Sequence, residues 1–207
     1  MNGRKWKMSA NMLKTKEEIL ASDNISATRL LSIYDKFQMN DSIPPHVLEN
    51  ATRRGLAVHD WIAKRLGGQL DAGLNPDLSD WIEAFNDFNK TIEGQEVVFV
   101  EQGIEYGLVK GILDAVFYDV DSDTYYIRDW KNTSKFAKEK TELQMQTYGW
   151  LLEKYLIIEK GISKPNIYLE GVHLKKGGKF KVYGWEYDAI KFYTLLNAYM
   201  LIEGVSK

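Results

Sequence analysis

The sequence predicts a mixed fold of helices and strands (α/β, or α+β), in which helices pack against one central β-sheet and an N-terminal helical region precedes it. Apolar residues recur at helical spacing until about residue 95. Residues 96–132 are then rich in β-branched and aromatic side chains, and a helix, two strands and a last helix follow. This order of elements is typical of a layered arrangement of helices on a sheet.

Helix boundary signals divide the first part of the chain. Ser26 is the expected N-cap of one helix, and Pro44 or Pro45 starts another that the glycine pair 67–68 ends. Ser79 is the expected cap of a further helix. The helices predicted in this part cover residues 15–21, 26–37, 46–66 and 78–92.

The second part of the chain is predicted to begin with strands. Residues 96–132 should form an antiparallel meander of three or four strands, with hairpin turns at Tyr106–Gly107 and Asp121–Asp123. The later elements are expected to be a helix from Glu142 to about Lys160, strands over 167–174 and 180–187, and a helix over 188–203.

Length and composition restrict the class of protein. The chain has 207 residues, of which 44% are hydrophobic and 27% charged, and these values predict one globular domain over residues 1–207. We expect residues 1–95 to form one helical wall of a cleft and residues 96–207 to form the remaining core. The chain has no cysteine, which excludes disulfides, thiolate zinc sites, cysteine-held iron–sulfur clusters and a cysteine nucleophile.

No segment has the properties of a membrane anchor. No stretch approaches about 18 consecutive apolar residues, and the first residues lack the apolar core of a signal peptide. We therefore expect a soluble cytoplasmic protein without a membrane partner, with a transit peptide as the alternative. The formal net charge of −2 argues mildly against a nucleic-acid binder, although a local basic groove would not change this count.

Two acids and one lysine point to chemistry. Asp114 in GILDAVF and Asp129 in YIRDWK each interrupt an apolar β-type run, and Lys131 follows Asp129 on the same strand face. If their strands pair, both carboxylates converge, and their mutual repulsion favours a cation between them. Oxygen ligands with open water positions suit Mg²⁺ or Mn²⁺. By itself, an aspartate at a strand edge is usually a turn residue, and a lone D-x-K occurs on many unrelated surfaces.

Three further side chains are candidates for the same site. His59 lies on the flank of a helix that should bury Val58 and Ile62, and an imidazole beside two carboxylates would favour Mn²⁺. Gln144 and Tyr148 are four residues apart on a helix and project from one face. Out of context, a lone histidine is more often packed or solvated, and the Gln144/Tyr148 pair more often packs against its sheet.

Four motifs occur in order: RRGLAVH at 53–59, GILDAVF at 111–117, YIRDWKNTS at 126–134 and QMQTY at 144–148. Together they resemble the RecB-like branch of the PD-(D/E)XK nuclease superfamily, with its G-x-x-x-H, G-x-x-D, I-x-D-x-K and Q-x-x-x-Y motifs. Over about residues 26–195 the chain looks most like small stand-alone exonucleases, such as the mitochondrial genome maintenance exonuclease and phage relatives. The usual D-x-K-T-S reads D-W-K-N-T-S here.

This resemblance implies a restriction-endonuclease-like core with a central mixed sheet, and it assigns roles to the candidate residues. The ligands of Mg²⁺ or Mn²⁺ would be His59, Asp114, Asp129, the backbone carbonyl of Trp130 and, as a second-tier ligand, Glu101. The catalytic group would comprise Asp114, Asp129, Lys131, Gln144 and Tyr148. Within it, Lys131 would be the catalytic lysine, while Gln144 and Tyr148 would support the site or hold the DNA strand.

The resemblance further implies a metal-dependent deoxyribonuclease without an iron–sulfur cluster. We expect an exonuclease that accepts single-stranded DNA ends; a structure-specific endonuclease and a non-catalytic DNA-binding module are the alternatives. Basic clusters could neutralise DNA phosphates along the cleft, although charge runs are more often solvated faces. The clusters are Arg53/Arg54, Lys64/Arg65, Lys135/Lys138/Lys140 and Lys175/Lys176/Lys179/Lys181.

Overall fold

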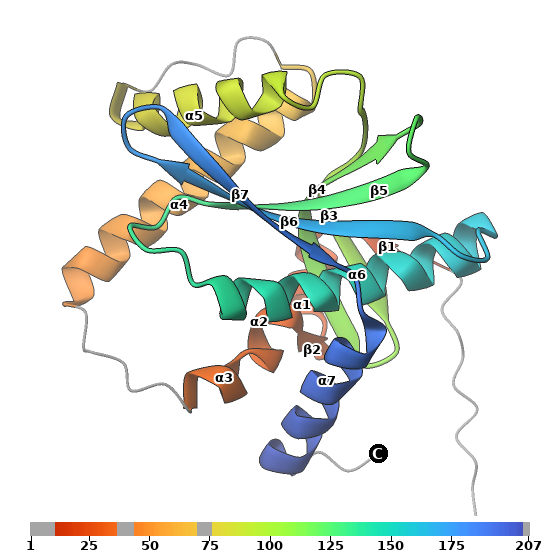
Figure 1. Ribbon diagram of the computed structural model, residues 1–207. Helices are drawn as coiled ribbons and strands as arrows, with labels where there is room; N and C mark the ends of the chain where they lie inside the picture. The colour runs from red at the N-terminus through yellow and green to blue at the C-terminus, as the bar shows by residue number, and fades with distance from the viewer. Residues whose placement is uncertain (1–10, 37–43, 70–75, 205–207) are drawn as a thin grey trace, which may run out of the picture.

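The computed structural model describes residues 11–36, 44–69 and 76–204, and these build a seven-stranded sheet with helices on both faces (Figure 1). The strands are β1 (Leu13–Lys14), β2 (Ile25–Ser26), β3 (Glu96–Tyr106), β4 (Val109–Asp119), β5 (Thr124–Lys131), β6 (Asn166–Lys175) and β7 (Lys179–Glu186). Their order in the sheet is β1-β3-β4-β5-β6-β7, and β2 pairs with β4 beside this path.

The sheet is mixed, which confirms the predicted fold class. β3, β4 and β5 form the expected antiparallel meander, with positive φ angles at Gly107 and Asp123 in its two turns. β5 and β6 run parallel, because a long helix carries the chain back between them. β6 and β7 complete the sheet as an antiparallel pair.

The helices agree broadly with the prediction. They are α1 (Lys16–Ala21), α2 (Ala27–Leu30), α3 (Ser32–Lys36), α4 (Pro45–Leu66), α5 (Ser79–Lys90), α6 (Lys138–Lys160) and α7 (Ala189–Glu203), with a 3₁₀ turn η1 (Pro76–Leu78). Pro45 is the first residue of α4 and Gly67 caps its end, as predicted. None of the helices in the described ranges is long and apolar enough to span a bilayer.

Two helix starts were predicted wrongly. Ser79 is not the cap of α5: it is the first helical residue, and Leu78 takes the cap position without a side-chain hydrogen bond. The 3₁₀ turn that precedes α5 leads directly into the helix, so no separate capping residue is needed. α6 begins at Lys138 instead of Glu142, because its charged first turn has no apolar periodicity that a sequence pattern could register.

The helix expected over residues 26–37 is divided into α2 and α3. Ser26 does act as an N-cap, and its hydroxyl accepts from the Arg29 backbone N–H at 3.0 Å. α2 ends at its C-cap Leu31 and α3 begins at Ser32, and Leu30 and Leu31 at this break are both buried in the cluster that α6 covers.

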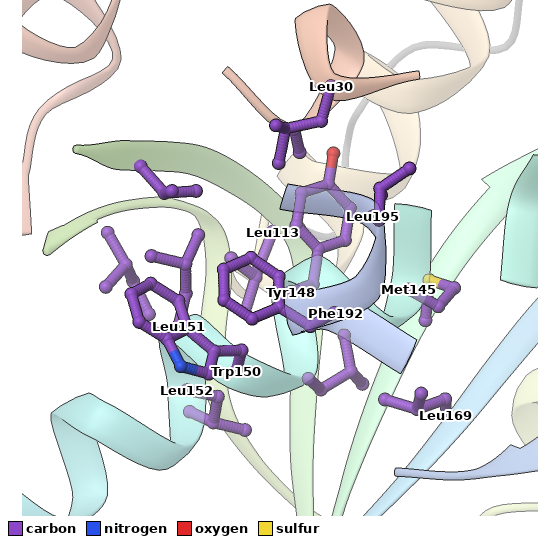
Figure 2. Packing of buried hydrophobic residues seen from close by; sticks show 14 of the residues in the cluster. Leu30, Leu113, Met145, Tyr148, Trp150, Leu151, Leu152, Leu169, Phe192 and Leu195 are labelled. Carbon is purple, nitrogen blue, oxygen red and sulfur yellow. The ribbon is translucent and has the colours of Figure 1, made fainter. Parts of the chain in front are cut away.

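The larger hydrophobic cluster lies between the sheet and α6 (Figure 2). Trp150 of α6 stacks on Phe192 of α7, with ring centroids 4.3 Å apart, so α7 covers the outside of α6. Leu30 and Leu113 join Tyr148 in the same cluster. This packing gives α6 a defined position, and therefore places the residues of its Q-x-x-x-Y motif next to β4.

α4 and α5 cover the opposite face of the sheet (Figure 1). Phe85 and Phe88 of α5 meet the Trp130 ring of β5 edge to face, at 5.4 and 5.6 Å between centroids. Val58 and Ile62 of α4 are buried in this second cluster, as predicted. The helix α4 is thereby orientated so that His59 lies on its flank, toward the point where the pairing of β4 and β5 ends.

The described residues before position 95 contribute to both faces of the sheet, and their part in a cleft stays a prediction. β1 and β2, which were not predicted, pair with β3 and β4, and residues from Ala27 to Ile33 pack in the cluster that α6 covers. α4 and α5 lie on the other face. The region is divided because its first segment pairs with the sheet, whereas its second segment only packs against it.

Candidate active site

β4 and β5 separate at the end of their ladder, and the two predicted aspartates lie where they part. The last paired residues are Ala115 and Arg128, and Asp114 and Asp129 come next on their strands. The Asp114 carboxylate enters the gap, and the backbone N–H of Trp130 donates to Asp114 Oδ2 at 2.9 Å. The two carboxylates therefore converge, as expected from the pairing of their strands.

Lys131 forms an ion pair with Asp129, in agreement with their two-residue spacing along β5. Lys131 Nζ lies 2.6 Å from Asp129 Oδ2, and the aspartate is almost fully buried. Burial raises the pKa of Asp129, which Lys131 opposes and Asp114 reinforces. Burial alone would lower the pKa of Lys131, but the two carboxylates raise it above its ordinary value, so its ammonium stays charged at neutral pH.

Gln144 and Tyr148 of α6 continue from this ion pair as a chain of hydrogen bonds. Lys131 Nζ donates to Gln144 Oε1 at 3.2 Å, and Gln144 Nε2 donates to Tyr148 Oη at 2.8 Å. Burial raises the pKa of Tyr148 well above its ordinary value, so the phenol stays neutral. The two α6 side chains therefore pack against the sheet and hold the lysine at the same time.

Two motif glycines lie where the motifs meet, and of the two only Gly111 leaves no room for a Cβ. A Cβ at Gly111, in the G-x-x-D strand, would lie 2.9 Å from Tyr148 Cε1, so the glycine admits the tyrosine ring against β4. A Cβ at Gly55, in the G-x-x-x-H helix, would lie 3.6 Å from Asn132 Oδ1. Asn132, which replaces the usual threonine, is thus buried at the contact between β5 and α4.

His59 reaches the gap from α4. Its Nε2 lies 2.8 Å from the Trp130 carbonyl oxygen, and its Nδ1 lies 3.3 Å from Asp114 Oδ2. Burial disfavours the charged imidazole, but Asp114 and, to a smaller extent, Asp129 outweigh this and raise the pKa of His59 to about 9. Without a bound cation, the ring is therefore protonated at neutral pH and donates from both nitrogens.

Glu101 of β3 completes a group of three donors. The donor atoms of His59, Glu101 and Asp114 all lie within 4.8 Å of one another, and Glu101 Oε1 is 4.0 Å from His59 Nδ1. The φ angle of Glu101 is +47°, a strained value for a residue other than glycine, and such strain concentrates at functional sites. The sequence ranked Glu101 below Asp129; within the described residues, Glu101 belongs to this group, whereas Asp129 pairs with Lys131.

The donor set fits a divalent cation. Two carboxylates and an imidazole supply the oxygen and nitrogen ligands that Mg²⁺ or Mn²⁺ accepts. Asp129 Oδ2 is buried without a hydrogen bond and has only its ion pair with Lys131, so it is a further oxygen that a cation could use. The Trp130 carbonyl, expected as a ligand, accepts from His59 Nε2, and its second lone pair could be offered to a metal.

A comparison with protein families identifies this arrangement. Residues 38–179, more than half of the chain, match the model of the PD-(D/E)XK nuclease superfamily. The chain belongs to the PD-(D/E)XK nuclease superfamily. Every candidate site residue derived from the sequence lies within the matched range of this nuclease, whereas the segment from β1 to α3 lies outside it.

The comparison with curated proteins found no match. Two solved structures are similar to this PD-(D/E)XK protein. An alkaline exonuclease (LHK-Exo) from Laribacter hongkongensis is 15% identical with a TM-score of 0.46, over 90% of this chain and 92% of that chain. The protein SSO0001 is 14% identical with a TM-score of 0.34, over 85% of this chain and 84% of that chain. The family assignment rests on the superfamily model.

One residue beside the site was not predicted from the sequence. Lys16 Nζ donates to Glu101 Oε2 at 3.0 Å. The polar, mixed-charge segment around it contains no motif, so no local signal would have singled out this lysine. Its relevance arises because α1 is placed beside β3 in the folded nuclease.

The predicted basic clusters are partly engaged in contacts within the protein. Lys64 pairs with Asp60 at 2.6 Å, and Lys140 pairs with Asp35 at 2.7 Å. The guanidinium of Arg54 lies over the Trp81 ring. A contact between these clusters and nucleic acid stays a prediction.

Proposed function

We propose that this superfamily member is a metal-dependent deoxyribonuclease of the RecB-like branch, which hydrolyses phosphodiester bonds from single-stranded DNA ends. The observation that carries the proposal is the convergence of His59, Glu101 and Asp114 beside the Asp129–Lys131 ion pair. Such a group of donors can hold a cation next to a phosphate, and a positive lysine lies within the same site.

Different residues would hold the metal and stabilise the phosphate in this reaction. The metal would be held by His59, Glu101 and Asp114, with Asp129 and the Trp130 carbonyl as further oxygens. When bound, it would polarise a phosphate oxygen and lower the pKa of a water molecule. Lys131 contributes a fixed ammonium that offsets phosphate charge and orients the attacking water, because its raised pKa makes it a poor proton acceptor.

Two helices bring cationic side chains to the Glu101 carboxylate. His59 of α4 approaches this carboxylate from one side, at 4.0 Å, and Lys16 of α1 approaches it from the other, at 3.0 Å. Both helices dock beside β3, so the carboxylate lies between two cations. The preference for a single strand rests on the resemblance to small stand-alone exonucleases, and the duplex sample below tests it.

The proposal is tested with an end-labelled linear single strand, incubated with Mg²⁺ or Mn²⁺. We expect the wild type to shorten it from an end, Lys131→Met to lose activity, and the control Lys90→Met, at an exposed ion pair of α5, to retain it. Parallel samples contain a duplex, an RNA strand and a closed single-stranded circle. Absence of cleavage with either metal would remove the nuclease activity, and rapid opening of circles would remove the exonuclease assignment.

A further inference from the structure

Lys16 lies outside the region that matches the superfamily model. Its ammonium is a second positive side chain beside Glu101, in addition to His59. Its Nζ donates to Glu101 Oε2 at 3.0 Å, whereas Glu101 Oε1 faces His59 Nδ1 at 4.0 Å. One oxygen of the Glu101 carboxylate thus accepts from Lys16, and the other faces His59 in the candidate metal site. A positive charge from the N-terminal segment is therefore in direct contact with a member of the candidate metal site.

The backbone at Lys16 is held to the sheet on both sides. Before it, Gln102 Nε2 donates to the Lys14 carbonyl at 2.9 Å, within the pairing of β1 and β3. After it, the buried Lys110 Nζ donates to the Ile19 carbonyl at 2.6 Å, near the end of α1. The position of Lys16 next to Glu101 consequently follows from the docking of α1, and is not a chance contact of a free terminus.

The side chain of Lys16, in contrast, is able to change partner. It is 52% exposed, compared with 25% for Lys131 in its ion pair with buried Asp129. An exposed ion pair on a flexible four-carbon stem is weak and is readily exchanged. Glu101 is the less mobile partner, since its strained backbone lies within β3.

A divalent cation among His59, Glu101 and Asp114 would repel this ammonium and attract a DNA phosphate to the same place. We propose that Lys16 is an exchangeable counter-cation: it neutralises Glu101 while no metal is bound, and it pairs with a DNA phosphate once the metal takes Glu101. The proposal rests on the metal-dependent function argued above. It assigns the N-terminal segment a direct part in metal and substrate binding.

The first test measures Mn²⁺ binding to the metal-free full chain by calorimetry. Lys16→Met and Lys16→Gln should bind Mn²⁺ roughly two- to fivefold more tightly than the wild type, because the competing ammonium is gone; this range is that of an exposed ion pair. Lys16→Arg, which keeps the charge, should resemble the wild type. Lys90→Met removes the lysine of an exposed pair with Asp87 on α5 and is the matched control.

The second test measures binding of a single-stranded oligonucleotide in Ca²⁺ at several salt concentrations, with gels to exclude cleavage. The loss of one phosphate contact in Lys16→Met should weaken binding and reduce the slope of log affinity against log salt by about 0.7.

The outcomes separate the two proposals. A wild type that binds no Mn²⁺ overturns the metal-dependent function together with the exchange. A wild type that binds Mn²⁺ with unchanged affinity in Lys16→Met overturns the exchange alone, as does weaker binding in the variant, which would mean that Lys16 only orients Glu101. An unchanged salt slope overturns the transfer to a phosphate.

Discussion

Raising the pH from 6.5 to 8.5 should strengthen Mn²⁺ binding by about tenfold per pH unit, because a metal at His59 Nδ1 must displace a proton. Asp114 and Asp129 outweigh the effect of burial and raise the pKa of His59 to about 9, so the ring is protonated over this whole range. Each pH unit below that pKa reduces the deprotonated fraction about tenfold, and the apparent affinity falls with it. Over two pH units, the apparent affinity for Mn²⁺ should therefore change roughly a hundredfold.

Stability without metal should change in the opposite direction. Because the pKa of His59 lies above its ordinary value of 6.5, the protonated ring stabilises the fold fully below pH 6.5, and this contribution is lost as the pH rises through about 9. The raised pKa of Asp129 also makes the metal-free fold less stable as the pH rises. The Tm of the metal-free protein should therefore fall over this range, whereas the increase of Tm caused by Mn²⁺ should grow.

Calorimetry in two buffers of different ionisation enthalpy measures both the affinity and the protons released, and about one proton is expected at pH 7. His59→Gln cannot release this proton, so most of the pH dependence should disappear in that variant. The reasoning fails if the wild-type affinity is constant from pH 6.5 to 8.5. It also fails if His59→Gln retains the full dependence.

Three substitutions test other parts of the structure. Glu170→Ala should lower the free energy of unfolding in urea by about 3 kcal/mol, because Arg128, only 1% exposed, would lose its partner at 2.7 Å; a loss below about 1 kcal/mol would contradict this. Gly111→Ala should displace Tyr148 and reduce kcat roughly ten- to a hundredfold, with metal affinity retained. Glu101→Gln should weaken Mn²⁺ binding at least about tenfold, and equal affinity would remove Glu101 from the metal site.

The parts of the fold that were predicted correctly depend on local patterns. The meander before Lys131 and the proline start of α4 both follow from residue types at fixed spacing. The errors occurred where tertiary contacts override such patterns. The helix expected over 26–37 is interrupted at Leu31, whose side chain is buried in the cluster that α6 covers, and Ser79 is the first residue of α5 because a 3₁₀ turn leads into it.

The sequence by itself determined the order of the main helices and strands from α4 onward and the candidates His59, Asp114, Asp129 and Lys131, because periodicity and motif spacing are properties of neighbouring residues. The tertiary structure decided which donors meet. Glu101 joins His59 and Asp114, and Lys16 contacts Glu101, only because α4 and α1 both dock against the sheet beside β3. Distances between elements far apart in the chain depend on this packing, which no local pattern contains.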